Sequence, residues 1–426
     1  MNSYSYHAMR YLGVIVLCFL LMTARAAATI QFTPGLTISS TFTDNASLTP
    51  EDEEYDYITT LNPGVDLSMY ERNSALTISY NPTYASYTRF PENNILRHSA
   101  AVGAWGKITD NTRIELGNRY LYTEDPISDT DFTVRQGREP YQTNTASFGI
   151  LNQFGKNDSI ALRYEYYLID NEDPSLENKE YYRPSLLLMY WMSPSRYALE
   201  WECKYTRNDL EISEDFDDVM NKLRLIKRFG RQFEGYIAYS HVDTVFMAGG
   251  DDYQVHSSLV GFDWKEQANS SLGASFGYFF RDTEAGDDDT GIVGSIESAY
   301  SWDEGSAIAV SGKVGYDIAS YGAENLGFSP FYHMSGSVSQ QLGKRLSGSI
   351  GTGYRRNIYM DQAPEREDTI WRSNAGLVYQ ALPWMAVRLE YVFRKLYSDD
   401  TANNYVENRG ILSVSLKPER EVRLNP

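Results

Sequence analysis

His241 and Asp243 form the one local pair of residues suited to acid–base chemistry. In a β-strand two such residues lie on the same face, where the carboxylate can orient the imidazole as a general base. That face also carries Phe233, Ile237 and Tyr239, which suit contact with an apolar environment. The chain has no Gly-flanked serine elbow, no Cys/His cluster at metal-ligand spacing and no phosphate-binding loop. We therefore expect no catalysis and neither a bound metal nor a cofactor.

Clusters of acidic residues are a second candidate for chemistry. They lie at 51–54, 214–218 and 287–289. Carboxylate oxygens suit Ca²⁺, but none of the clusters has the spacing of a defined calcium-binding loop. A solvated surface is therefore the favoured interpretation of all three.

Charged residues also recur at alternate positions between apolar and aromatic ones. In the segment 159–169, Leu162 and Tyr164 alternate with Arg163 and Glu165. A period of two is typical of a β-strand, whose successive side chains point to opposite faces. Nearly every such segment repeats the pattern, so one face of the sheet should meet lipid and the other water. The charged residues assigned to the water-filled interior are Arg119, Arg163, Glu165, Arg183, Lys204, Lys222, Arg224, Arg281, Arg355, Arg372, Arg388 and Arg394.

This set is mostly basic and predicts a mildly basic lumen beneath an acidic outer rim. Wall charges set the selectivity of a pore, so anionic or hydroxyl-rich solutes would be favoured. The alternative is structural: Glu200 and Glu202 would pair with Lys222 and Arg224 on the next strand and stiffen the wall.

Tyrosines on the same water-facing side offer a further possibility. Tyr167, Tyr181 and Tyr236 could form a sliding surface for sugar rings. Packing within the wall is the favoured alternative, because aromatic rings commonly stabilise neighbouring strands.

Two kinds of connection separate the predicted strands. Short turns such as 155–158 and 343–344 contain Gly, Asn or Asp, which suit tight hairpins. Long acidic loops such as 125–140 and 171–180 lie at the opposite ends of the strands. This rhythm predicts an all-β, closed antiparallel transmembrane β-barrel of about 20 strands, with about 18 as the alternative, short periplasmic turns and longer acidic extracellular loops. The first and last strands must pair, since an open edge in hydrocarbon leaves backbone groups unsatisfied.

Aromatic residues are distributed unevenly along these strands. Tyr122, Tyr239 and Tyr391 sit towards the long loops, whereas several tryptophans lie near the short turns. Such a split predicts two interfacial girdles, although Trp201 and Trp371 do not fit it. The tryptophans assigned to the girdle are Trp105, Trp191, Trp264, Trp302 and Trp384.

Composition agrees with a membrane barrel. The chain is 42% hydrophobic with a mean hydropathy of −0.45, values that are typical of a soluble protein. Membrane strands do not raise such averages, because their apolar residues alternate with polar ones. Its 34 tyrosines, 31 glycines and net charge of −19 suit aromatic belts and acidic loops. An acidic chain does not favour nucleic acid as a partner.

Residues 1–28 have the pattern of a secretory signal, with Arg10 before a short apolar run and small residues at a cleavage site. We expect its removal to leave a barrel over 29–417 and a charged tail over 418–426. Only Cys203 then remains, so no disulfide can form within the mature chain. The expected location is the outer membrane of a Gram-negative bacterium, with lipid and the barrel-insertion machinery as partners and a monomer as the functional unit.

The runs TDNASL at 43–48 and ITTLNPGV at 58–65 flank an acidic loop. They resemble the opening of a family of outer-membrane β-barrels, the porins associated with exosortase (PEP-CTERM) and exopolysaccharide gene clusters. The resemblance covers the first predicted hairpin and implies a conduit for exopolysaccharide that works with periplasmic export components. General diffusion of small solutes and a surface-binding, adhesive barrel are the alternatives. In one departure from the common pattern, the last strand does not end on an aromatic residue, and the charged tail follows Leu416.

Overall fold

The computed structural model describes residues 29–125, 137–193, 196–266, 269–284, 286, 288–318, 326–362, 365–419 and 422–423. The predicted signal, residues 1–28, and most of the predicted tail lie outside this part of the chain. Within the described ranges, no helix has the length and apolarity needed to cross a membrane.

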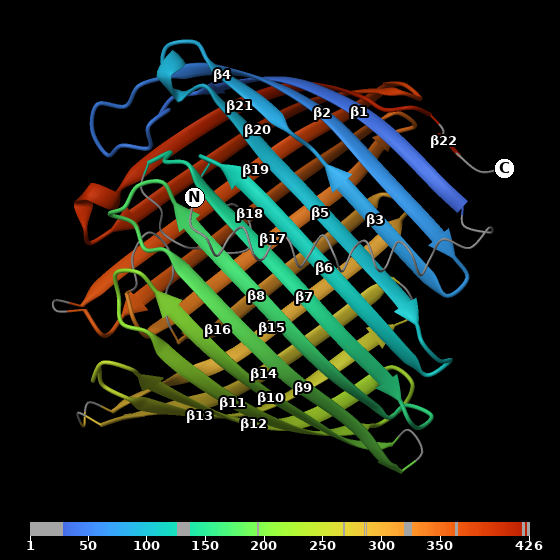
Figure 1. Ribbon diagram of the computed structural model, residues 1–426, viewed down its shortest axis with the longest axis vertical. Coiled ribbons are helices and arrows are strands. Elements are labelled where there is room, and N and C mark those ends of the chain that lie inside the picture. Colours follow the sequence, from blue (N-terminus) through green and yellow to red (C-terminus); the bar gives the residue numbers. More distant parts are fainter. Residues whose placement is uncertain are drawn as a thin grey trace.

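A single antiparallel sheet closes on itself (Figure 1). The first strand, β1 (Thr29–Thr43), pairs with β2 (Asp56–Glu71) on one side and with β21 (Tyr405–Leu416) on the other. Closure leaves no open edge, as the lipid environment demands. The other elements are β3 (Ser74–Tyr80), β4 (Thr83–Tyr87), η1 (Pro91–Asn93), β5 (Ile95–Lys107), β6 (Thr112–Thr123), β7 (Tyr141–Gln153), β8 (Ser159–Asn171), β9 (Lys179–Ser193), β10 (Tyr197–Leu210), β11 (Phe216–Arg228), β12 (Phe233–Phe246), β13 (Tyr253–Glu266), β14 (Ser270–Thr283), β15 (Asp289–Asp303), β16 (Ser306–Asp317), β17 (Ser329–Gly343), β18 (Leu346–Tyr359), β19 (Arg366–Leu382), β20 (Met385–Ser398), η2 (Thr401–Asn403) and β22 (Val422–Arg423).

Two of these segments do not add a strand to the wall. β3 and β4 are pieces of one strand, since β2 and β5 pair with both, and the break falls at Asn81 and Pro82. A proline cannot donate to the ladder, which explains the interruption. β22 pairs with β1 beyond the end of β21 and extends that strand. The wall therefore has 20 strands, which confirms the predicted count of about 20.

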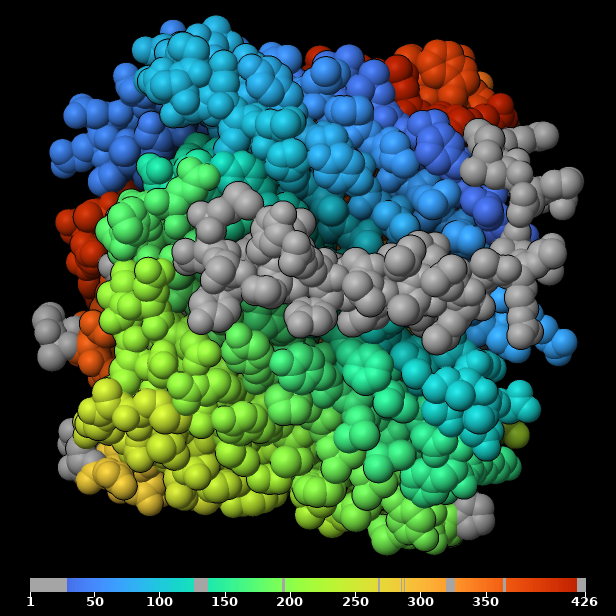
Figure 2. Space-filling view, in the orientation of Figure 1, coloured from blue at the N-terminus to red at the C-terminus, as the bar shows by residue number. Residues whose placement is uncertain are grey.

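The strands present an apolar face outward. Phe276 and Ile350 are each 66% exposed, and Val260 and Ile237 nearly as much. Cross-strand register keeps such residues on one side of the sheet, for example where Ile237 lies opposite Val260. Figure 2 shows a continuous outer surface of the same kind on the front of the barrel, where the green strands from β7 to β10 lie in the lower half of the view. Such a surface suits the hydrocarbon of a bilayer.

The loop between β1 and β2 turns back into the barrel. Ala46 and Leu48 are buried there, and Leu48 packs against Ile370, Leu396 and Tyr405 on the inner face of β19 to β21. Leu48 has a φ of 55°, a left-handed conformation that is unfavourable for leucine. Burial of its side chain stabilises that conformation.

Candidate pore lining

All twelve charged residues predicted to line the interior lie on the inner face of the wall. Alternate residues of a strand share one face of the wall, so the position of a residue in its strand decides whether it points inward. Arg224, for example, lies between Leu223 and Leu225, which are exposed on the outside. Register then carries the inner face from strand to strand, as where Arg372 lies opposite Arg394. These twelve are Arg119, Arg163, Glu165, Arg183, Lys204, Lys222, Arg224, Arg281, Arg355, Arg372, Arg388 and Arg394.

The ionic contacts between β10 and β11 differ from the predicted stiffening pairs. Glu200 lies opposite Arg224, and Glu202 opposite Lys222. The salt bridges instead join Lys204 Nζ to Glu202 Oε1 at 2.6 Å and Arg224 Nη2 to Asp263 Oδ2 at 2.8 Å. The register thus places the alternative pairs opposite each other, but Glu202 and Arg224 form their salt bridges with other partners. Lys222 makes no salt bridge to any residue the structure describes.

The inward tyrosines pack against each other and against arginines. The rings of Tyr167 and Tyr181 stack at 5.1 Å between centroids, and the Arg183 guanidinium lies 4.3 Å from the Tyr181 ring centroid. Tyr181 donates to Glu165 Oε1 at 2.6 Å. Tyr236 lies under Arg224, whose Cζ is 3.7 Å from its ring centroid. Aromatic faces thus line the interior on two parts of the wall.

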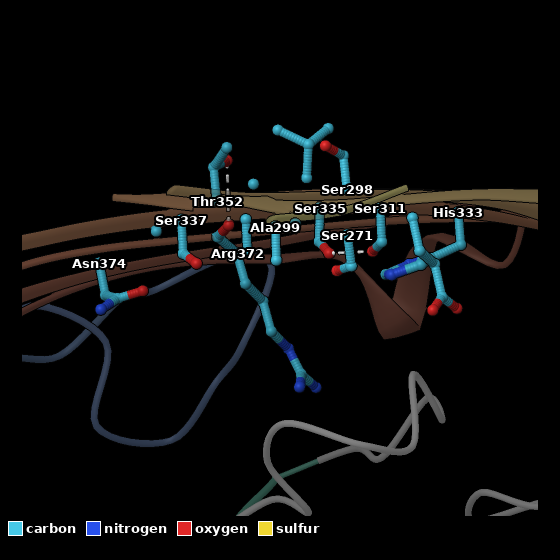
Figure 3. Close-up of a pocket in the computed structure, with 16 residues that line it drawn as sticks. Ser271, Ser298, Ala299, Ser311, His333, Ser335, Ser337, Thr352, Arg372 and Asn374 are labelled. Carbon is cyan, nitrogen blue, oxygen red and sulfur yellow. Dashed lines mark hydrogen bonds between the residues drawn. The ribbon is translucent and has the colours of Figure 1, made fainter. Parts of the chain in front are cut away.

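The inner wall from β14 to β19 is built of small residues (Figure 3). It forms a cavity of about 490 Å³ lined by Ser271, Ser311, Ser335 and Ser337, among others. The Ser311 and Ser335 hydroxyl oxygens lie 2.6 Å apart. Arg372 extends from this wall towards the interior. Short side chains leave space inside the barrel while their hydroxyl groups keep it polar.

A buried ion cluster lies at the extracellular end of the barrel. Asp125, which follows β6, receives Arg409 Nη2 from β21 at 2.9 Å and also pairs with Arg138. Arg138 in turn reaches Glu407 of β21 at 2.5 Å and donates to the Ala46 carbonyl at 2.6 Å. The ends of the loop between β6 and β7 are therefore joined by salt bridges to β21. In the sheet, β1, β2 and β5 lie between β6 and β21. This cluster holds the loop ends inside the barrel.

Asp125 remains ionised in this cluster. Burial alone would raise the pKa of its carboxyl, but Arg409, Arg138 and Arg97 outweigh that effect and hold the pKa well below its usual value. Beside it, Glu124 accepts from Tyr87 at 2.6 Å and pairs with Arg97.

A second group of inward side chains lies against β12 to β15. Phe328, which precedes β17, is fully buried against Tyr253 and Phe279. Arg281 lies between two rings, 4.3 Å from the Tyr253 centroid and 4.6 Å from that of Phe328. Asp361 accepts from Arg281 at 2.9 Å and from the Phe328 amide at 2.8 Å. Segments from two loops thus cover this part of the inner wall.

The predicted tryptophan girdle divides between the two faces. Trp264 lies opposite the exposed Phe233, and Trp302 and Trp384 are 39% and 47% exposed. Trp105 and Trp191 differ from the prediction because they share parity with inward residues. Their rings receive the guanidinium groups of Arg113 and Arg228, each at 4.4 Å.

His241 and Asp243 lie on the outer face, and no hydrogen bond joins their side chains among those of the described residues. The His241 ring packs 4.7 Å from that of His256, and its Nε2 lies 3.4 Å from Gln254 Oε1. Among the described residues, no group of three or more His, Cys, Asp or Glu could hold a metal ion.

Loop carboxylates instead bind backbone amides of neighbouring loops. Glu177 is buried and accepts from the amides of Glu211, Ile212 and Ser213 at 2.8 to 2.9 Å. Glu214 accepts from two amides of the next loop, including that of Gly250 at 3.3 Å. Some carboxylates of the acidic rim therefore join neighbouring loops through hydrogen bonds to backbone amides.

The ion cluster was not identified from the sequence. Arg138 and Glu407 are 269 residues apart, and Asp125 and Arg409 are 284 residues apart. No local sequence spacing links residues so far apart. The one sequence signal near the cluster was the predicted long loop at 125–140, which contains Asp125 and Arg138.

Known proteins resemble the chain in sequence and in fold. A family model described as Putative beta-barrel porin 2 matches residues 29–167 and 267–418. No curated protein matches. The siderophore receptor PirA from Pseudomonas aeruginosa has a TM-score of 0.52 at 9% identity, with 91% of this chain and 80% of that chain covered. A variant of the ferric enterobactin receptor PfeA from the same organism gives 0.52 at 8% identity with the same coverage, and OccK2 gives 0.46 at 8%, with 91% and 98% covered. At these identities the structures share the barrel fold alone.

Proposed function

The chain belongs to the Putative beta-barrel porin 2 family, and from this premise we propose that its lumen conducts small hydrophilic solutes by diffusion, with a preference for anions. The protein is a β-barrel porin of the Gram-negative outer membrane. The transport mechanism is passage through hydrated space without covalent chemistry. One barrel is sufficient, because β1 and β21 close the wall within a single chain.

The inner face of the wall is the observation that carries this proposal. It combines hydroxyl groups, such as those of Ser311 and Ser335, with cationic side chains that no described carboxylate balances. Arg119 and Arg163 are exposed on this face and make no salt bridge among the described residues. Uncompensated wall charges of one sign attract mobile ions of the other.

Planar-bilayer recording tests the proposal. The refolded barrel should give discrete current steps, and the reversal potential across a salt gradient should have the sign of anion preference. Cation preference would contradict the assignment of selectivity to the arginines. Silent insertion would contradict diffusion itself and favour a surface-binding role for the extracellular loops.

Exopolysaccharide export is a second candidate, supported by the Tyr167–Tyr181 stack on the inner face and by the resemblance of the first hairpin. Stacked aromatic faces can pack against the CH groups of sugar rings. Deleting the gene should then reduce secreted polymer. The wild-type chain should restore it, and a folded Tyr167→Ala/Tyr181→Ala variant should restore less. Unchanged polymer after deletion would exclude this role and, with it, the periplasmic export components as partners.

A further inference from the structure

A second cavity of about 370 Å³ lies where the wall bends between β11 and β16. In Figure 1 this is the lower end of the barrel, where the front strands β11 and β12 give way to the rear strands β13 to β16. Its wall includes four serines. These are Ser240, Ser257, Ser275 and Ser295.

One end of the cavity is apolar because the ladder between β15 and β16 stops early. It ends at the pair Gly294 and Val314, although β15 continues to Asp289. Beyond that pair Tyr316 reaches the interior, where its hydroxyl lies 3.0 Å from Ser257 Oγ and its ring 5.0 Å from that of Phe279. The Val293 and Tyr316 side chains line this end.

Cationic groups line the remainder. Lys222, Arg224 and Lys313 belong to the lining, which contains no carboxylate among the residues the structure describes. Arg224 uses Nη2 for Asp263, and its Nε is buried without a hydrogen-bond partner. A buried donor without an acceptor is costly, so an incoming anionic oxygen would be stabilised there.

We propose that this cavity binds an organic anion with an apolar body, its carboxylate directed to Lys222, Arg224 and Lys313 and its hydrocarbon part to Val293 and Tyr316. The proposal rests on the proposed pore function, because the ligand reaches the cavity through the lumen. It makes the barrel selective for amphiphilic anions over inorganic ones. Burial of the hydrocarbon part adds favourable free energy of binding that simple inorganic ions lack.

Hexanoate is the probe, added to single-channel recordings of the refolded barrel. It should interrupt the current in discrete events, whereas acetate, which lacks the hydrocarbon, and 1-hexanol, which lacks the charge, should not. Lys222→Ala/Lys313→Ala should shorten the mean interruption at least fivefold. The matched control is Lys227→Ala/Lys344→Ala, since Lys227 lies on the other face of β11 and Lys344 in a short turn. That control should change the interruption less than twofold.

Equal interruptions by acetate, or an unchanged duration in Lys222→Ala/Lys313→Ala, would overturn the site and leave the pore function intact. If the barrel conducts no current, calorimetry of hexanoate binding in detergent decides separately. Binding that weakens at least fivefold in Lys222→Ala/Lys313→Ala would support the site while the pore proposal fails. Absence of binding would overturn the site as well.

Discussion

At the scale of single residues, Asp125 is the most consequential side chain of the extracellular end. Replacing it in Asp125→Asn removes the countercharge of Arg138 and Arg409, and hydrogen bonds to charged groups contribute about 1.5–3 kcal/mol. The loop ends should be released more often, so open-channel current noise should rise severalfold. Asp173→Asn is the control, because among the residues that the structure describes the Asp173 carboxylate bonds only to Ser175 in its own loop. Equal noise in both variants would contradict a special role for the cluster.

The same carboxylate predicts how the pore responds to pH. Its pKa in the folded protein lies well below the usual value near 3.8, so the cluster's stabilisation is fully present above that value and is lost only as pH falls through the lowered pKa. Current noise should therefore stay constant from about pH 8 down to about pH 4.5 and rise only in stronger acid. A rise between pH 7 and 5 would show that another group controls the loop ends.

At the scale of strands, much of the wall was predictable and the loop packing was not. The period of two placed Arg163 and Arg372 inside, because parity is a local property of a strand. The same alternation would have placed Trp105 inside, because it lies eight residues from the inward Arg97 and an even separation along a strand keeps two side chains on one face. Leu48 and Arg138, in contrast, find their partners on β19 to β21, and no local pattern encodes that contact.

Close packing between strands gives a further prediction at this scale. A Cβ atom at Gly277 of β14 would lie 2.1 Å from the Ser258 carbonyl oxygen, so backbone must move in Gly277→Ala. Overpacking of this kind typically costs about 1–3 kcal/mol. The variant should melt at a lower temperature in detergent than Gly336→Ala, whose new atom would meet nothing closer than 3.9 Å. Equal melting temperatures would mean that β13 and β14 separate easily at this point.

The inner face as a whole should decide ion selectivity. Arg119→Glu/Arg163→Glu reverses two exposed inward charges and should shift the reversal potential towards cations. Arg72→Glu/Lys156→Glu makes the same change in net charge within short turns and should shift it less. If the two double variants shift the potential equally, overall charge rather than the lining controls selectivity.

At the scale of the whole molecule, the barrel closes by two unequal contacts of β1. Eight residue pairs join Leu36–Thr43 to Arg409–Leu416, and two more join Gln31 and Phe32 to β22. Deleting residues 418–426 removes only the second contact. Because the longer ladder still leaves no open edge, the truncated chain should insert and conduct like the full one.

Ending the chain at Gly410 provides the contrast, because it removes six of the eight closing pairs and exposes an edge of β1 to hydrocarbon. That chain should fail to give a folded, heat-resistant barrel. If deletion of 418–426 alone abolishes assembly in cells while refolding in detergent succeeds, the tail carries a signal for the insertion machinery. Leu416, as the end of the last full strand, would then not be sufficient for recognition.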